Sequence, residues 1–284
     1  MLRSWMFIPG SKDKHLQKAN QLKADAIIFD LEDAVAESEK SHARKKVIQY
    51  LKGIKDKQCF VRVNALSSKH FLEDIKEVVC QELTGIMLPK VSSSEDIIIA
   101  DYLLQHMEIK YGLPDQTILI VPLIENAAGV HHAYNIANAS QRILCLAFGA
   151  EDFKLDVTVE SEDSEPELHY TRSKMVVDSG AAGIEAPIDA VYTAIRDDSG
   201  LKASSEASKN IGFQGKLAIH PKQISVINDV YAYTEAQIRE AKEIVVAYEE
   251  SMERGDGAVE LNGEMIDIPV AEKAKKILEK IEMN

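Results

Sequence analysis

Short apolar runs recur along the chain and alternate with stretches whose apolar residues repeat at helical spacing. The apolar runs occupy Ser4–Ile8, Ala26–Phe29, Phe60–Val63, Gly85–Leu88, Ile118–Ile124, Ile143–Phe148, Gly183–Ile188 and Lys216–Ile219. The helical stretches include Lys14–Lys23, Glu39–Lys52, Phe71–Glu82, Ser94–Tyr111 and Gly129–Ala139. Strands that are apolar without strict alternation are typical of a parallel sheet buried on both faces. Eight such strands, alternating with helices, predict an α/β fold of the closed (β/α)8 TIM-barrel type.

An open, doubly wound sheet is the alternative to a closed barrel. Sheets of that kind commonly bind nucleotides through a glycine-rich turn after an early strand. Neither GxGxxG nor GxxxxGK[ST] follows the early strands of this chain, so the barrel is favoured.

The pattern changes after residue 220. Thr234–Glu253 reads as one long amphipathic helix with a threonine at its start. The pair Asn262-Gly263, between two alternating runs, predicts a hairpin, and Pro269 opens a final helix. We therefore expect a catalytic barrel domain over residues 1–230 and, over residues 231–284, a helical arm that acts as a lid or bridges subunits.

The composition narrows the class of protein. The formal charge of −13 argues against a general binder of nucleic acid or of anionic membranes. The three cysteines are scattered without CxxC spacing, which indicates reduced thiols and a cytoplasmic location. The opening apolar run is too short for a signal peptide or a membrane span. One acidic stretch, Val159–Leu168, is expected to be a solvated loop or a loop over the barrel mouth.

Polar residues gather where the predicted strands end. They are Asp30, Glu32 and Asp33 after the second strand, Arg62 and Asn64 on the third, Lys90 after the fourth, Glu125 after the fifth and Asp152 after the sixth. In a β/α barrel these ends form one rim, where active sites lie. A single carboxylate at such a place is more often a helix cap than a ligand. Arg62 lies between two valines in a buried strand, so it needs an anion, and a structural salt bridge to Asp30 or Glu32 would also satisfy it.

Two of these acids suit a hard divalent cation. Mg²⁺ commonly takes one or two protein carboxylates and keeps its other positions for water and substrate oxygens. Glu125 and Asp152, at neighbouring strand ends, meet that need. The sequence holds no HExxH motif and no clustered Cys and His residues that would indicate zinc.

Eight short pieces then occur in order from residue 3 to about residue 275. They are RS…FIPGS at 3–11, FDLEDAV at 29–35, VRVN at 61–64, MLPKV at 87–91, IENAAG at 124–129, FGAEDF at 148–153, GK…IHP at 215–221 and MIDIP at 265–269. Together they resemble the citrate lyase β-subunit-like family, which includes malyl-CoA and citramalyl-CoA lyases. The resemblance implies a β/α barrel with Mg²⁺ held by Glu125 and Asp152.

The resemblance also implies roles for further residues. Arg62 would grip the carboxylate of an α-oxoacid, with Glu125 beside the same substrate. The acids matching Asp30, Glu32 and Asp33 would lie near the metal's waters. Arg3, Lys12 and Lys14 are weaker candidates for the phosphates of coenzyme A. Asp267, in the C-terminal arm, would act as acid or base. Trimers are common in the family, so a homotrimer or hexamer is expected.

The activity implied by this resemblance is cleavage or formation of a 3-hydroxyacyl-CoA thioester, with an α-oxoacid such as glyoxylate, pyruvate or oxaloacetate on the other side. Two alternatives stay open. One is a pyruvate-type aldolase that acts on free hydroxyacids without CoA. The other is a non-catalytic or carrier-dependent subunit, because citrate lyase β subunits act on a thioester presented by an acyl carrier protein.

Overall fold

The computed structural model of this protein describes residues 1–54, 57–159 and 168–282. Residues 160–167 of the acidic stretch, for which we expected a loop, lie outside the described residues. The chain divides into two compact units, Leu2–Tyr231 and Ala232–Asn284.

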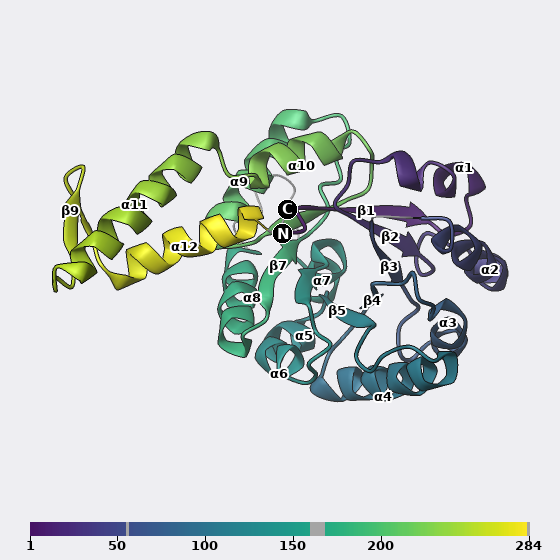
Figure 1. The fold of residues 1–284 in the computed structure, drawn as a ribbon. Coiled ribbons are helices and arrows are strands. Elements are labelled where there is room, and N and C mark those ends of the chain that lie inside the picture. Colours follow the sequence, from purple (N-terminus) through teal and green to yellow (C-terminus); the bar gives the residue numbers. More distant parts are fainter. Residues whose placement is uncertain (55–56, 160–167, 283–284) are drawn as a thin grey trace. The chain divides into compact units, whose positions relative to one another are not determined.

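Eight parallel strands of the described chain close into a barrel, which confirms the predicted fold class (Figure 1). Neighbouring strands pair in sequence order, and β1 closes the ring against β8. The strands are β1 Ser4–Pro9, β2 Ala26–Asp30, β3 Gln58–Arg62, β4 Gly85–Leu88, β5 Leu119–Ile124, β6 Cys145–Phe148, β7 Glu185–Asp189 and β8 Gly215–Ala218. Each boundary coincides with that of a predicted apolar run to within one residue, except at the starts of β6 and β7, which begin two residues later than expected, and of β3, which begins two residues earlier.

Side chains alternate across the barrel wall, which explains why apolar runs form these strands. Trp5, Phe60 and Met87 pack in a buried cluster inside the barrel. Ile27 and Val61, each one position along from an inward residue, belong to the larger cluster between barrel and helices. Because successive strand side chains point to opposite faces, both faces must be apolar. The same alternation turns Arg62 to the inside.

Helices cover the outside of the barrel (Figure 1). They are α1 Asp13–Leu16, α2 Lys40–Leu51, α3 Phe71–Val78, α4 Ser94–Tyr111, α5 Ala127–His131, α6 Ala133–Ala137, α7 Ala150–Asp156, α8 His169–Ala182, α9 Asp198–Ile211 and α10 Gln223–Tyr231. Short 3-10 turns occupy Ala19–Gln21 and Glu37–Glu39.

Two of the expected helices are shorter than predicted. The stretch Lys14–Lys23 holds only the single turn of α1 and a 3-10 turn, because Leu16 and Ala19 are its only fully buried apolar residues and give a longer helix too little to pack on. The stretch Gly129–Ala139 is divided between α5 and α6 at His132, whose backbone leaves the helical region. Helix α4 matches its prediction because a capping box of Ser93 and Asp96 begins it and Gly112, in the left-handed region, ends it.

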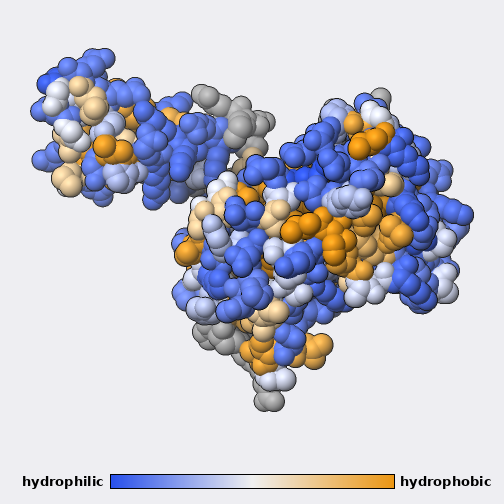
Figure 2. All heavy atoms as spheres, turned by 90° about the horizontal axis from the view of Figure 1, so that it is seen from below, coloured by the Kyte–Doolittle hydropathy of each residue, from blue (hydrophilic) through white to orange (hydrophobic). Residues whose placement is uncertain are grey.

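Helix α4 also presents an apolar surface to solvent. It runs along the lower edge of Figure 1, the side from which Figure 2 is viewed, and Figure 2 shows hydrophobic residues gathered on that side of the barrel. Ile98, Ile99 and Ile109 are 55%, 45% and 71% exposed. Contiguous exposed apolar side chains of this kind mark interaction surfaces.

The C-terminal unit contains α11 Glu235–Glu253, the antiparallel pair β9 Val259–Leu261 and β10 Glu264–Ile266, and α12 Ile268–Glu282. The hairpin turns at Asn262 and Gly263, with φ of 53° and 85°, which are the positive values a type I′ turn requires. Tyr248, Ile266 and Ala271 form a small core of its own. None of the helices in the described chain is both long and apolar enough to span a membrane.

Candidate active site

The predicted polar residues of the barrel converge on its carboxyl rim, which is the ring formed by the ends of β1–β8. Asp30 and Arg62 are the last residues of β2 and β3 and are register partners. Glu125 follows β5 directly, and Asp152 lies in the first turn of α7, just after β6. Parallel strands all end on the same side, so residues far apart in sequence meet there.

Arg62 is held by the acidic residues of β2 and the turn after it. Its Nε and Nη2 donate to the two carboxylate oxygens of Asp30 at 2.8 and 2.6 Å. Its Nη1 lies 3.2 Å from Glu32 and 3.5 Å from Asp33, and its guanidinium stacks 4.9 Å from the centre of the Phe7 ring. The structural salt bridge that the sequence left open is therefore present. Asp30 occupies the Nε/Nη2 edge of this five-donor group, while Nη1 already faces Glu32 and Asp33, so a second anion at the Nη1/Nη2 edge would share these donors with the two acids.

Glu32 is a buried acid without a well-directed hydrogen bond. It is 5% exposed, and its oxygens lie 2.9 Å from Lys90 Nζ and 3.2 Å from Arg62 Nη1. Neither oxygen has a hydrogen bond of good geometry among the described residues. Burial raises the pKa of Glu32, although the positive charges of Arg62 and Lys90 act in the opposite direction.

Lys90 connects the acidic turn, which is the segment of residues 30–33 at the end of β2, to Glu125. Its backbone N–H donates to Glu125 Oε1 at 2.7 Å, while its Nζ reaches Glu32. Its φ of 58° puts a non-glycine residue in the left-handed region, a conformation that is uncommon and often occurs at functional sites. The sequence placed Lys90 at the rim but gave no sign of this backbone conformation.

Glu125 is the most perturbed acid of the rim. It is 3% exposed, and burial raises the pKa of Glu125 to about 8, with the negative charges of Glu32 and Asp152 adding to the rise. Gly149 packs against it so closely that a Cβ built there would lie 2.6 Å from both Cβ and Oε2 of Glu125. Sequence reasoning missed Gly149, because nothing local distinguishes it from an ordinary glycine before a helix.

A small pocket brings the predicted metal pair and Arg62 together. It has a volume of about 80 Å³, and Arg62, Glu125 and Asp152 line it, with Phe7 and Phe148 among its apolar walls. The pocket thus offers two carboxylates and a guanidinium edge within a partly apolar enclosure, which is the composition expected of a site for a small anion and a cation.

The rim side chains fit a divalent cation. Five carboxylates (Asp30, Glu32, Asp33, Glu125 and Asp152) face two cations (Arg62 and Lys90), so the set carries three uncompensated negative charges when fully ionised. A cation beside Glu125 would relieve the repulsion that raises its pKa. In the described part of the chain no group of three or more His, Cys, Asp or Glu side chains is arranged to hold a metal ion. Mg²⁺ does not require such a cage, because it commonly binds one or two carboxylates and keeps several waters.

Three predicted basic residues do not line this pocket, and a fourth predicted site residue belongs to the C-terminal unit. Arg3 precedes β1 at the amino end of the barrel, where its guanidinium pairs with Asp25 at 2.8 and 2.9 Å, so the structure does not bring it to the rim. Lys12 and Lys14 are exposed on and beside α1, directly after β1 ends at the rim. Asp267 belongs to the C-terminal unit, where its carboxylate accepts a hydrogen bond from the Val270 N–H at 3.2 Å and caps α12.

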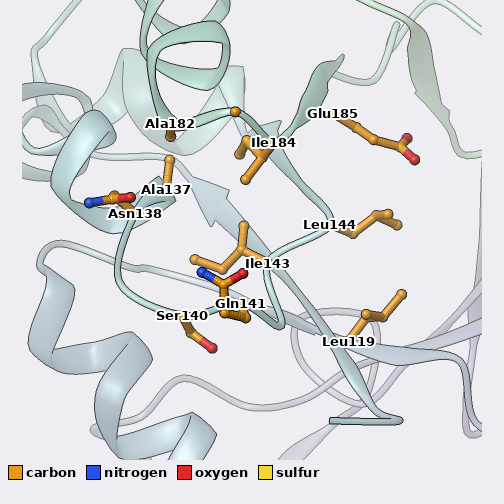
Figure 3. A pocket seen from close by; sticks show the side chains of 11 residues that line it. Leu119, Ala137, Asn138, Ser140, Gln141, Ile143, Leu144, Ala182, Ile184 and Glu185 are labelled. Atoms are coloured by element: carbon orange, nitrogen blue, oxygen red, sulfur yellow. The ribbon is translucent and has the colours of Figure 1, made fainter.

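A larger pocket at the other end of the barrel is less suited to an anionic ligand. It measures about 330 Å³ and lies where β6 and β7 begin, near the end of α8 (Figure 3). Its lining includes one carboxylate, Glu185, which accepts a hydrogen bond from Gln214, and no lysine or arginine among the described residues. The rim pocket is therefore the better candidate site despite its smaller volume.

Known proteins resemble this chain in sequence and in fold. The model of the HpcH/HpaI aldolase/citrate lyase family matches residues 3–221. The citrate lyase subunit beta of Leuconostoc mesenteroides subsp. cremoris is 36% identical over 278 residues, covering 97% of this chain and 92% of that protein. The mitochondrial citramalyl-CoA lyase of Rattus norvegicus is 31% identical, over 97% and 85%. The crystal structure of CitE from Mycobacterium tuberculosis, in complex with magnesium, acetoacetate and coenzyme A, superposes with a TM-score of 0.79 at 26% identity, over 98% and 97%. This chain therefore belongs to the HpcH/HpaI aldolase/citrate lyase family, as a carbon–carbon lyase of the citrate lyase β-subunit type.

Proposed function

We propose that this lyase depends on Mg²⁺ and cleaves, or forms, a 3-hydroxyacyl-CoA thioester such as citramalyl-, malyl- or citryl-CoA. The products of cleavage would be an α-oxoacid and an acyl-CoA. The observation that carries this proposal is the convergence of Glu125, Asp152 and Arg62 on one rim pocket. The magnesium, oxoacid and coenzyme A bound by the CitE relative support it.

Some of the rim residues would bind the ion, and others would bind the substrate. Glu125 and Asp152 would hold Mg²⁺, with Glu32 and Asp33 adding negative charge beside it. When bound, the ion supplies Lewis-acid stabilisation of the charge that develops on the reacting oxygen. Arg62 would bind the oxoacid carboxylate through its Nη1/Nη2 edge, while Asp30 fixes the guanidinium from the other side. A planar two-pronged donor suits that task better than a lysine.

The reaction also needs proton transfer. Cleavage removes the hydroxyl proton, breaks the carbon–carbon bond and leaves a thioester enolate that must be protonated at carbon. Asp267 is our candidate for that acid/base role, from its own or a neighbouring subunit. Lys12 and Lys14 would attract the phosphates of coenzyme A. We do not extend that role to Arg3, because Asp25 already occupies its guanidinium.

Two observations support alternative substrates, which the experiment must also include. The family description includes aldolases, which act on free hydroxyacids without a thioester. The Leuconostoc relative is a subunit, which suggests a thioester presented by a partner such as an acyl carrier protein. We also infer assembly into a trimer or hexamer, supported by the exposed apolar face of α4. Light scattering of the wild type and of Ile109→Asp would test that assembly.

The decisive experiment for activity uses the full chain with Mg²⁺ and a panel of citramalyl-, malyl- and citryl-CoA. We expect at least one thioester to be cleaved, with activity lost on chelation of the metal. Asp152→Asn should abolish turnover and Mg²⁺-dependent pyruvate binding while the protein stays folded. Glu206→Gln, at an exposed carboxylate on α9 that does not line the rim pocket, is the matched control and should keep both. Metal-dependent turnover retained by Asp152→Asn would overturn the ligand assignment, and cleavage of only free hydroxyacids or carrier-bound thioesters would replace the substrate.

A further inference from the structure

A buried lysine on α2 donates hydrogen bonds to the backbone of the acidic turn. Lys40, the first residue of α2, is 9% exposed. Its Nζ donates to the carbonyl oxygens of Leu31 and Glu32, both at 2.9 Å. These two peptide groups lie between Asp30, which fixes Arg62, and Asp33. Lys40 therefore acts on the segment that carries three of the five rim acids without contacting the pocket itself.

Neither helix stability nor ion pairing accounts for Lys40. A cation at the first position of a helix faces the positive end of the helix dipole, which is unfavourable. Burial of an ammonium group carries a desolvation penalty, and lysine is seldom fully buried without a partner. In the described part of the chain Lys40 forms no ion pair with a carboxylate, and its Nζ donates to two backbone carbonyls. The contacts that offset its burial are those that fix the turn.

The same face of α2 supports the turn through a second route. Arg44, one helical turn after Lys40, donates to Asp74 at 3.0 Å. Asp74 in turn accepts from the side chain of Asn64, whose Nδ2 also donates to the Leu31 carbonyl at 3.1 Å. The Leu31 oxygen thus accepts from both Lys40 and Asn64, which uses both of its lone pairs. The Glu32 carbonyl likewise accepts from Lys40 and from the Val35 N–H at 3.0 Å.

We propose that Lys40 is a positioning residue for the metal and oxoacid site: by fixing the Leu31 and Glu32 peptides it sets where the Glu32 and Asp33 carboxylates stand relative to Glu125 and Arg62. This inference rests on the proposed Mg²⁺ site. Groups that orient the ligands of a metal, without touching it, typically change metal affinity or activity by roughly 10- to 100-fold when removed. Lys40 acts one step further from the metal, through the turn that carries Glu32 and Asp33 beside the proposed ligands, so we expect the lower end of that range.

The experiment compares Lys40→Met with Lys209→Met in the full-length protein. Lys209, on α9, also donates its Nζ to a backbone carbonyl, that of Val230 at 2.7 Å, but does so away from the rim. We would measure the thermal midpoint without metal, and the dissociation constant of pyruvate at saturating Mg²⁺ by calorimetry. We expect both variants to lose thermal stability. Only Lys40→Met should weaken Mg²⁺-dependent pyruvate binding, by about 10-fold.

The outcomes separate this inference from the function on which it rests. If the wild type binds no pyruvate with Mg²⁺, the proposed function fails, and the inference fails with it. If the wild type binds but Lys40→Met binds equally well, with only its thermal midpoint lowered, Lys40 is structural and the inference alone is overturned. Should Lys40→Met not fold, Lys40→Gln decides. Its amide ends one bond short of the position of the ammonium group, so it should not reach both carbonyls; we expect several-fold weaker binding, and wild-type affinity in that variant would overturn the proposal.

Discussion

Replacing Gly149 with alanine tests the role of Glu125 without altering any charged group. Gly149 begins the turn between β6 and α7, and its backbone is not in the left-handed region, so an alanine there meets no intrinsic backbone strain. The added methyl carbon would instead lie 2.6 Å from Cβ and Oε2 of Glu125. Such contacts are ordinarily 3.4–4 Å, so the effect of the substitution is steric and directed at one carboxylate.

The geometry sets the size of the expected effect. Lengthening the contact from 2.6 to 3.4 Å requires a displacement of about 0.8 Å, and part of it must come from the backbone at residue 149 or at Glu125, because Glu125 Cβ is among the atoms met. Overpacking of this kind typically costs about 1–3 kcal/mol of folding stability. Mg²⁺ requires oxygen distances of about 2.0–2.1 Å in near-octahedral geometry. A misplacement near 1 Å can lower the rate of a reaction about 100-fold, and we expect a loss of similar size in the Mg²⁺-dependent affinity for pyruvate.

The assay is calorimetric titration of pyruvate at saturating Mg²⁺, with thermal unfolding measured in parallel. Gly149→Ala should unfold a few degrees lower than the wild type, because 1 kcal/mol corresponds to about 2–4 °C for a chain of this size. Gly180→Ala on α8 is the matched control. No atom lies within 4 Å of its added carbon, so it should keep wild-type binding and gain about 0.5–1 kcal/mol in helix stability. Wild-type affinity in a folded Gly149→Ala variant would refute Glu125 as a ligand in this geometry.

Three further predictions follow from the rim and the arm. Because burial and neighbouring acids raise the pKa of Glu125 to about 8, Mg²⁺ must displace a proton from Glu125 below that pH, and the affinity of the protein for Mg²⁺ should rise up to about tenfold per pH unit toward pH 8. Calorimetry in buffers of different ionisation enthalpy should detect the released proton. An Mg²⁺ affinity that does not change with pH would contradict the assignment. Arg62→Lys removes the two-pronged donor and should weaken Mg²⁺-dependent pyruvate binding at least about tenfold, since hydrogen bonds to charged groups contribute about 1.5–3 kcal/mol; unchanged pyruvate affinity would exclude the carboxylate contact. Asp267→Asn keeps a good helix cap for α12 but removes the acid/base, so kcat should fall about 10²- to 10⁴-fold with pyruvate binding retained, and an unchanged kcat would reduce Asp267 to a cap.

The fold could be read from the sequence because its barrel depends on a local pattern. Each strand is apolar on both faces, since one side meets Trp5 and Phe60 inside the barrel and the other meets helices such as α2 outside. The turn at Asn262 and Gly263 was equally readable, because positive φ at both positions restricts which residues can stand there. Helix length was less predictable. His132 divides α5 from α6, and packing decides that division, since the apolar spacing on either side continues.

The rim residues were found as a set because parallel strands end on one side, which follows from the fold class alone. Their individual relations were not accessible in this way. The sequence allowed Arg62 to serve as a salt bridge or as a substrate ligand. Strand register decides that Asp30 takes the Nε/Nη2 edge of its guanidinium, while Nη1 faces Glu32 and Asp33. The sequence placed Arg3 in the same basic group as Lys12 and Lys14, although β1 separates it from them by the full length of the barrel wall.

By itself, then, the sequence determined the order of strands and helices, the edge of the barrel where polar groups meet, and the family through eight ordered motifs. Only the tertiary structure decided which charged side chains form ion pairs and which acid is buried enough to hold a proton near neutral pH. It alone also decided that Lys40 donates hydrogen bonds to the backbone of the acidic turn. The physical reason is range. Strand and helix patterns arise from neighbours a few residues apart, whereas burial and ion pairing at Glu125 depend on residues 32, 90 and 152, which the closing of the barrel brings together.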